Sequence, residues 1–221
     1  MKKSSSQFDR RHFIKTSTTF TLGLAGFSVF PQQAFSMGNA DEEINVIGPL
    51  QGFSPQVGTL VSMMNWMRMV ILQPVQNMTV EQLDYLHDAK SNTIGSMLLH
   101  LAATERYYQL HTFDEMKWGT WNDTIKKQWQ IPMRLGEDAR KNIKGNKLEF
   151  YLDTLKEVRE KSIEEFKKRD DNWLMKVDKE WPWGPTNNYC KWFHVCEHES
   201  NHNGQIKWIQ SRLPGAKVGE E

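Results

Sequence analysis

Apolar residues recur at three- and four-residue spacings in four long segments of the chain, which is the period of an amphipathic helix. These segments are residues 55–73, 93–110, 147–168 and 188–209. The sequence Thr-Val-Glu-Gln that begins at Thr79 is a capping box and predicts a short additional helix near Leu86. We found no convincing strand. The pattern therefore predicts an all-α fold, a mainly antiparallel four-helix bundle in which residues 112–145 form one long crossover connection.

The first long segment, residues 55–73, is apolar on more than one side. Its apolar residues are Val57, Leu60, Val61, Met63, Met64, Trp66, Met67, Met69, Val70, Ile71 and Leu72. A helix with this coating is buried on two faces. One face is expected to meet the bundle. The other is expected to meet either a second subunit, which would make a homodimer, or the lead-in segment 37–53.

Three histidines lie on the last segment at positions i, i+4 and i+8, namely His194, His198 and His202. This spacing stacks side chains along one face of a helix. At a rise of about 1.5 Å per residue, the outer two lie roughly 12 Å apart along the axis. Two metal–nitrogen bonds of about 2.0–2.1 Å span far less. One adjacent pair is therefore the candidate for a metal site.

The apolar positions of the same segment indicate which of the two histidine pairs faces the bundle interior. If they mark the seam of the bundle, His198, His202 and Gln205 lie on that seam, and His194 lies at its edge. Metals in helical bundles are held by side chains that project inward from facing helices. His198 and His202 are therefore the predicted pair.

The third ligand is expected upstream of this segment. Residues 198–202 also match the HExxH pattern of zinc peptidases, in which Glu199 would be the general base. Only 19 residues follow His202, however, and they offer no good third ligand, so the peptidase is the weaker alternative. His100 lies on the apolar stripe of segment 93–110, beside Met97, and we predict it as the third ligand. Glu105 is expected at the surface or rim of that segment, as is Tyr107.

Three histidines leave an open coordination position for water or substrate, as in catalytic zinc sites. Zinc is the first choice of divalent metal ion, and nickel and iron are the alternatives, because all three accept imidazole. Trp181, Trp183 and Tyr189 precede the histidines and are expected to line the mouth of the pocket. Glu199 is expected either to accept a proton or to be a carboxylate that supports the ligands from behind or lies at the rim.

The N-terminal residues predict export. Arg10-Arg11 is followed by His-Phe-Ile-Lys and a mildly apolar run, which resembles a bacterial twin-arginine signal, although Asp9 departs from that pattern. The run at 16–30 is too short and too rich in Thr, Ser and Gly to span a bilayer with ease. We therefore expect a cleaved signal peptide and a periplasmic protein with no membrane span. The predicted parts are residues 1–36 (signal), 37–53 (lead-in), 54–213 (metal-binding domain) and 214–221 (tail).

Composition and charge narrow the class of protein. The chain has 221 residues, of which 38% are hydrophobic and 25% charged, which suits one globular domain. Residues 1–36 carry five basic residues and one acidic residue, so their removal changes the formal net charge from +1 to −3. No basic stripe then remains to bind nucleic acid. Cys190 and Cys196 lie roughly 9 Å apart along a regular helix, too far for a disulfide, and are expected to be free and largely buried.

Two stretches, SNTIGSMLLHLAATERYY and HVCEHESNHNGQI, together resemble the DinB-like (YfiT-like) family of metal-binding four-helix bundles over roughly residues 55–211. The resemblance implies metal ligation by His100, His198 and His202, with Gly204-Gln205 completing the signature. It departs at Asn203, where relatives often have Arg.

The family includes thiol-dependent transferases and metal-dependent hydrolases, so the resemblance implies an enzyme that activates a thiol or water toward a small-molecule substrate. The thiol cofactors of such transferases are cytosolic, which counts against a thiol transferase in an exported protein. The alternative is a non-catalytic protein that binds a metal or small ligand.

Overall fold

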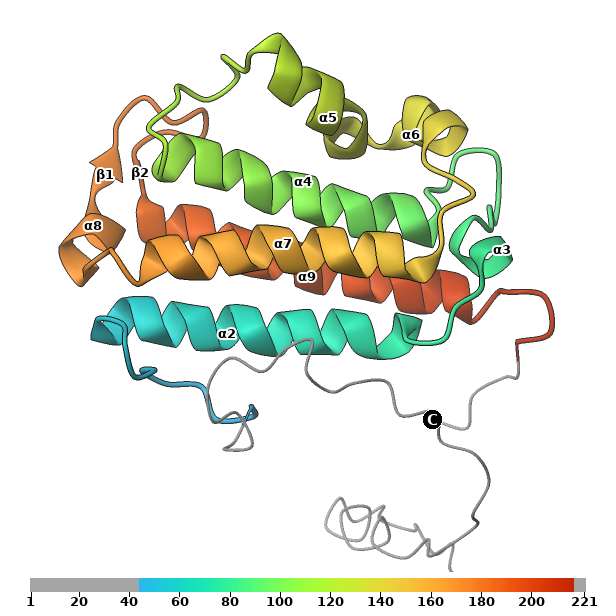
Figure 1. Cartoon of the computed structure of the whole chain (residues 1–221), viewed down its shortest axis with the longest axis horizontal. Coiled ribbons are helices and arrows are strands. Elements are labelled where there is room, and N and C mark those ends of the chain that lie inside the picture. The colour runs from blue at the N-terminus through green and yellow to red at the C-terminus, as the bar shows by residue number, and fades with distance from the viewer. Residues whose placement is uncertain (1–43, 217–221) are drawn as a thin grey trace, which may run out of the picture. The chain divides into compact units, whose positions relative to one another are not determined.

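A computed structural model describes residues 44–216 of the chain (Figure 1). The predicted signal segment lies outside the described residues, as do the first part of the predicted lead-in and the end of the tail. The division of the chain into these parts stays a prediction.

Four long helices form the bundle, as predicted. They are α2 (Pro55–Leu72), α4 (Ile94–Thr112), α7 (Leu148–Phe166) and α9 (Asn188–Gln210). The short elements are η2 (Gln73–Val75), α3 (Val80–Leu83), α5 (Asp123–Arg134), α6 (Gly136–Asn142), α8 (Asp171–Met175), β1 (Val177–Asp178) and β2 (Thr186–Asn187). The two strands pair antiparallel, Val177 with Asn187 and Asp178 with Thr186. The all-α prediction is therefore confirmed, with one two-residue hairpin that the pattern did not predict.

The direction of the helices explains the long crossover. Helices α2 and α9 run one way, and α4 and α7 run the other way (Figure 1). Helix α4 packs against both α7 and α9, and α2 packs against α9. The pairs α4–α7 and α2–α9 are therefore parallel, which corrects the expectation of a mainly antiparallel bundle. A chain that joins two parallel neighbours must return along their whole length, and residues 113–147 make that return.

No helix was predicted within the crossover, and it contains two. Asn122 caps α5, because its Oδ1 accepts a hydrogen bond of 2.9 Å from the backbone nitrogen of Ile125. Trp129 and Pro132 are its buried residues. Helix α5 packs against α4, and this contact brings its C-terminal turn to the candidate site.

Side chains cap two of the long helices. Asn187 caps α9 by accepting from the backbone nitrogen of Cys190, and Thr93 caps α4 by accepting from the backbone nitrogen of Ser96. The neighbouring Asn92 contacts the crossover, because its Oδ1 accepts a hydrogen bond of 3.1 Å from the backbone nitrogen of Gly136. The residue before the cap of α4 is thereby linked to the start of α6.

The core consists of two apolar clusters with a layer of buried charges between them. Each long helix contributes one charged residue to this layer: Arg68, Glu105, Arg159 and Glu199. Glu105 was expected at the surface, and that prediction was wrong, because two arginines from other helices accompany it into the core. Tyr107 is buried as well.

The lead-in covers part of the second apolar face of α2. The backbone nitrogen of Gly48 donates to Ser62 Oγ at 3.1 Å, and Trp66 Nε1 donates to Asn45 Oδ1 at 3.2 Å. These contacts match the covering alternative. A homodimer through this helix stays a prediction.

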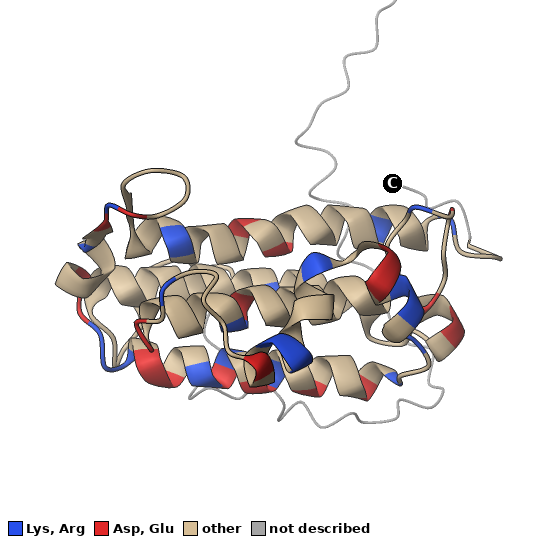
Figure 2. Ribbon diagram, turned by 90° about the horizontal axis from the view of Figure 1, so that it is seen from above, with Lys and Arg blue, Asp and Glu red and all other residues tan. Residues whose placement is uncertain are grey.

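The surface of the described residues carries interspersed charges. Lysine and arginine alternate with aspartate and glutamate along the bundle (Figure 2). None of the described helices is both long and apolar enough to cross a membrane. Both cysteines are free, but only Cys196 is buried. Cys190 is exposed in the first turn of α9, so the expectation that both thiols are largely buried was wrong for this residue.

Candidate metal centre

The structure brings His100, His198 and His202 together. His100 comes from α4, and the other two lie one turn apart on α9. One ring nitrogen of each lies within 4.8 Å of the others, and the two Nε2 atoms of His100 and His198 are 2.8 Å apart. Their ligation of a metal stays a prediction, but the geometry is what a shared ion requires.

A backbone carbonyl fixes the orientation of His100. Its Nδ1 lies 3.0 Å from the carbonyl oxygen of Pro132 in the last turn of α5. Carbonyls in the last turn of a helix have no partner within the helix, and α5 ends because Leu135 adopts a positive φ of 53°. The Nδ1–H therefore donates to Pro132, and Nε2 keeps its lone pair for a ligand bond.

Burial keeps the three imidazoles neutral. It lowers the pKa of His198 to about 3, with a further contribution from the neighbouring histidines. Burial, with the adjacent His100, lowers the pKa of His202 to about 4. It also lowers the pKa of His100. Neutral imidazole is the form that binds a metal ion.

One polar atom at the cluster has no partner in the described part of the chain. His202 is buried, and its Nδ1 makes no hydrogen bond. Such an atom calls for an explanation, and an ion or water at the site supplies one. The neutral nitrogen donors, their spacing and this orphaned atom all fit a divalent metal ion of the kind that accepts imidazole.

His194 lies beside the cluster but outside the set of converging nitrogens. Its Nδ1 is 2.9 Å from the hydroxyl of Tyr108, and its ring centroid is 5.3 Å from that of His198. Trp183, which is 59% exposed, packs edge-on against His194 at 4.9 Å. The choice of His198 and His202 over a pair with His194 therefore agrees with the geometry.

The aromatic residues expected at the pocket mouth divide into two groups. Trp183 is exposed next to His194, as predicted. Trp181 is buried, with the ammonium of Lys191 4.5 Å from its ring centroid, and Tyr189 packs against the second apolar cluster. Only Trp183 has the position expected of a residue at the mouth.

Glu199 is neither a general base nor a rim carboxylate. Its side chain is 1% exposed, and its Oε1 lies 2.5 Å from Arg68 Nη2 and 3.0 Å from Arg159 Nη2. The buried seam of α9 runs through Val195 and Glu199, so this glutamate takes the central position and His198 flanks it. Two arginines hold the carboxylate in the core, and the peptidase alternative lacks its base.

Two residues that follow His202 on α9 bear on the family resemblance. Gln205 was expected on the seam but is exposed. Asn203 is buried, and its Oδ1 has no partner among the described residues. The neutral amide of Asn203 brings no cation to the site, as the departure from Arg implied.

The contribution of Pro132 was missed from the sequence. The signal for α5 was present, because Asn122 is a helix cap and Ile125, Trp129 and Pro132 follow at spacings of four and three. The hydrogen bond between the Pro132 carbonyl and the distant His100 could not be predicted, because no sequence pattern indicates a contact of this kind.

The helical architecture and the histidine cluster define a DinB-like bundle that could hold a divalent metal ion. A family model described as mycothiol-S-transferase matches residues 59–215. The chain therefore belongs to the mycothiol-S-transferase family. A comparison with curated proteins gives no match.

Proposed function

We propose that this protein is a metal-dependent S-transferase that joins a low-molecular-weight thiol to an electrophilic small molecule. The observation that carries the proposal is the convergence of His100, His198 and His202 within 4.8 Å in a member of the mycothiol-S-transferase family. When bound, a divalent metal ion supplies the Lewis-acid chemistry that keeps a coordinating thiol deprotonated near neutral pH. Zinc is the first choice of ion.

The residues of the chain prepare this site in three ways. Pro132 holds His100 in one tautomer, which leaves Nε2 free. Arg68 and Arg159 tie Glu199 into the core, so the α9 backbone that carries His198 and His202 is fixed from two other helices. Burial of His202 limits the access of water to the cluster. The nitrogen donors that would hold the metal ion and its thiol are therefore neutral and already in place.

The test combines metal content with transfer of a thiol. Protein purified without a histidine tag is expected to contain about one metal ion per chain. With mycothiol and 1-chloro-2,4-dinitrobenzene it is expected to release chloride as the carbon–sulfur bond forms and the thiol proton passes to the buffer. His198→Ala should abolish both the metal and the transfer. His194→Ala is the matched control, because this histidine lies on the same helix outside the converging set, and it should keep the metal.

Three other results would contradict the metal site or favour a different function. Metal retained in full by His198→Ala would contradict the site. A metal-replete protein that transfers no thiol to any electrophile, but binds one tightly, would favour the non-catalytic binding protein. Hydrolysis of esters or amides without thiol would favour a hydrolase.

We also propose export through the twin-arginine segment. The family match begins at residue 59 and leaves the Arg10-Arg11 segment outside it. Fractionation of cells that express the full chain should place the protein in the periplasm, and replacement of both arginines by lysine should retain it in the cytoplasm. A cytoplasmic wild-type protein would contradict export, and would place it with the thiol cofactors that the family uses.

A further inference from the structure

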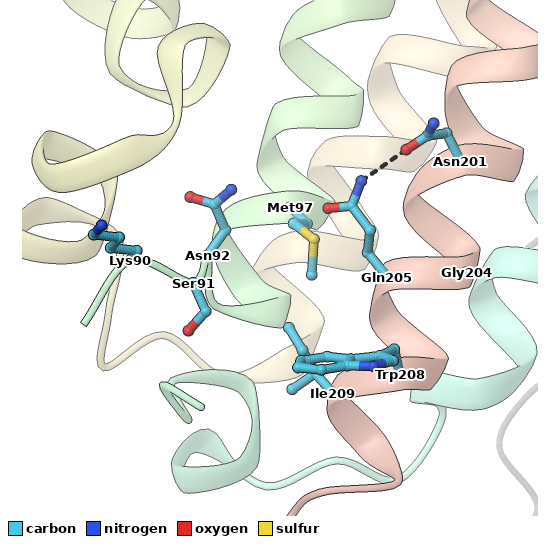
Figure 3. Close-up of a pocket in the computed structure, with 9 residues that line it drawn as sticks. All are labelled: Lys90, Ser91, Asn92, Met97, Asn201, Gly204, Gln205, Trp208 and Ile209. Carbon is cyan, nitrogen blue, oxygen red and sulfur yellow. Dashed lines mark hydrogen bonds between the residues drawn. The ribbon is translucent and has the colours of Figure 1, made fainter. Parts of the chain in front are cut away.

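A cavity of about 510 Å³ lies next to the histidine cluster, between the start of α4, the loop before it and the last turns of α9 (Figure 3). Met97 lines it and precedes His100 by three residues. Gln205 lines it and follows His202 by three residues. Three residues correspond to about 4.5 Å along a helix, so the cavity and the cluster are neighbours on both helices.

Gly204 leaves one wall of the cavity open. It lies inside α9, where glycine costs about 1 kcal/mol relative to alanine. A Cβ built on Gly204 meets nothing within 4 Å, whereas one on Gly95 would lie 2.6 Å from the Tyr151 hydroxyl. Packing within the described residues therefore explains Gly95 but not Gly204. Close approach of a ligand to the α9 backbone explains it.

Most of the free polar atoms that line the cavity are donors. Asn92 Oδ1 already accepts from Gly136, and Asn201 Oδ1 accepts from Gln205 Nε2 at 2.7 Å. The Nδ2 group of Asn92 thus remains to donate, and Lys90 adds an ammonium. The Asn201 amide nitrogen points away from the middle of the cavity, and one acceptor, Gln205 Oε1, points into it (Figure 3). No acidic residue belongs to this lining among the described residues. The cavity therefore favours a group rich in acceptor oxygens and disfavours a cation.

Trp208 supplies an aromatic surface. Figure 3 shows its indole lying across one end of the cavity. The ring is 45% exposed, yet it is held by His87, edge-on at 4.7 Å, and by the guanidinium of Arg212 at 3.8 Å from its centroid. An exposed indole that two side chains hold in place is ready to receive the flat face of a ligand.

We propose that this cavity binds a small carboxylate with a ring face. The ring lies on Trp208 and against Gly204, and the carboxylate oxygens accept hydrogen bonds from Asn92 and Lys90. The role of this molecule rests on the proposed function, in which it is the acceptor substrate that the thiol attacks at the adjacent histidine cluster. The binding itself does not depend on the metal.

The experiment measures binding directly, by proton–nitrogen NMR of the tryptophan indoles. The Trp208 signal is identified by its loss in Trp208→Phe. Benzoate, the probe, is expected to shift this signal in a saturable way. Benzylamine has the same ring and the opposite charge, and is expected to leave it in place at the same concentration.

Three variants make the result specific. Gly204→Leu places a larger side chain at the open wall. Its Cβ meets nothing within 4 Å and leucine is a better helix former, so the variant should fold and lose the benzoate shift. Ser200→Leu, at an exposed position of the same helix, should keep it. His198→Ala should also keep it, which separates this proposal from the proposed function. Equal shifts with benzylamine, a shift that persists in Gly204→Leu, or no shift at all would overturn the proposal.

Discussion

Glu199 Oε1 lies 2.5 Å from Arg68 Nη2, so the residue next to the candidate ligand His198 is bound to a cation from another helix. Arg159 approaches the same oxygen, and both arginines also contact Glu105. The layer contains two cations and two carboxylates, one from each long helix. Because these charges are buried together, the removal of one leaves another without a partner. The layer therefore fixes which parts of the four helices face one another.

Arg159→Met is expected to lower the free energy of unfolding by about 3–5 kcal/mol, because it leaves a buried carboxylate uncompensated. Urea titration of the metal-free protein measures this loss. Lys156→Met is the matched control on the same helix. Its ion pair with Glu160 is exposed, at 3.9 Å, so the change should be within about 1 kcal/mol. Equal losses in the two variants would contradict the importance of the buried layer.

The contribution of Glu105 to stability should depend on pH in a defined direction. Burial acts to raise the pKa of Glu105, but the charges of Arg159 and Arg68 outweigh it and hold the pKa below the usual value. A group with a depressed pKa in the folded state stabilises it above the unfolded pKa of about 4.3. That contribution is lost as the pH falls through the folded value.

Glu105→Gln resembles the protonated state, so the variant should be much less stable than the wild type at pH 7. The difference should shrink only in acid, below the ordinary glutamate pKa. Urea titrations from pH 7 to pH 3 measure it. A difference that stays constant over this range would show that the carboxylate's charge is not what stabilises the fold.

The long helices and the histidine cluster could be predicted because both depend on spacing along one helix. His198 and His202 stand four residues apart on a partly apolar segment, and His100 stands on the apolar stripe of another. The charged layer could not be predicted in the same way. Arg68 and Glu199 are 131 residues apart, and an isolated charge in a helical pattern is ordinarily assigned to the surface.

The helices within the long connection were not predicted, for a related reason. The apolar positions of residues 123–134 are few, although the cap at Asn122 was visible. Stability of α5 comes from packing on α4, which no local pattern reports. The parallel direction of α4 and α7 was implied by the length of that same connection.

Two glycines inside helices should respond to alanine in opposite ways. Gly95→Ala is expected to lower the free energy of unfolding by about 1–3 kcal/mol, because the new methyl group would lie 2.6 Å from the hydroxyl of the fully buried Tyr151. Gly204→Ala meets nothing within 4 Å and should raise it by up to about 1 kcal/mol. Thermal unfolding of the two variants measures both changes. Stabilisation by Gly95→Ala would show that α4 and α7 can separate at little cost.

Metal binding should stabilise the fold through His202. An ion that binds the native state alone adds about 2.7 kcal/mol at a free concentration of 100 times its Kd. Zinc added to the metal-free protein is therefore expected to raise the melting temperature, and a chelator should reverse the rise. His202→Ala removes a buried member of the converging set and should lose the response. His87→Ala is the control, because His87 is exposed and packs against Trp208 away from the cluster, and the response should remain. An undiminished response in His202→Ala would place the zinc elsewhere on the protein, since an ion held by His100 and His198 alone would bind more weakly.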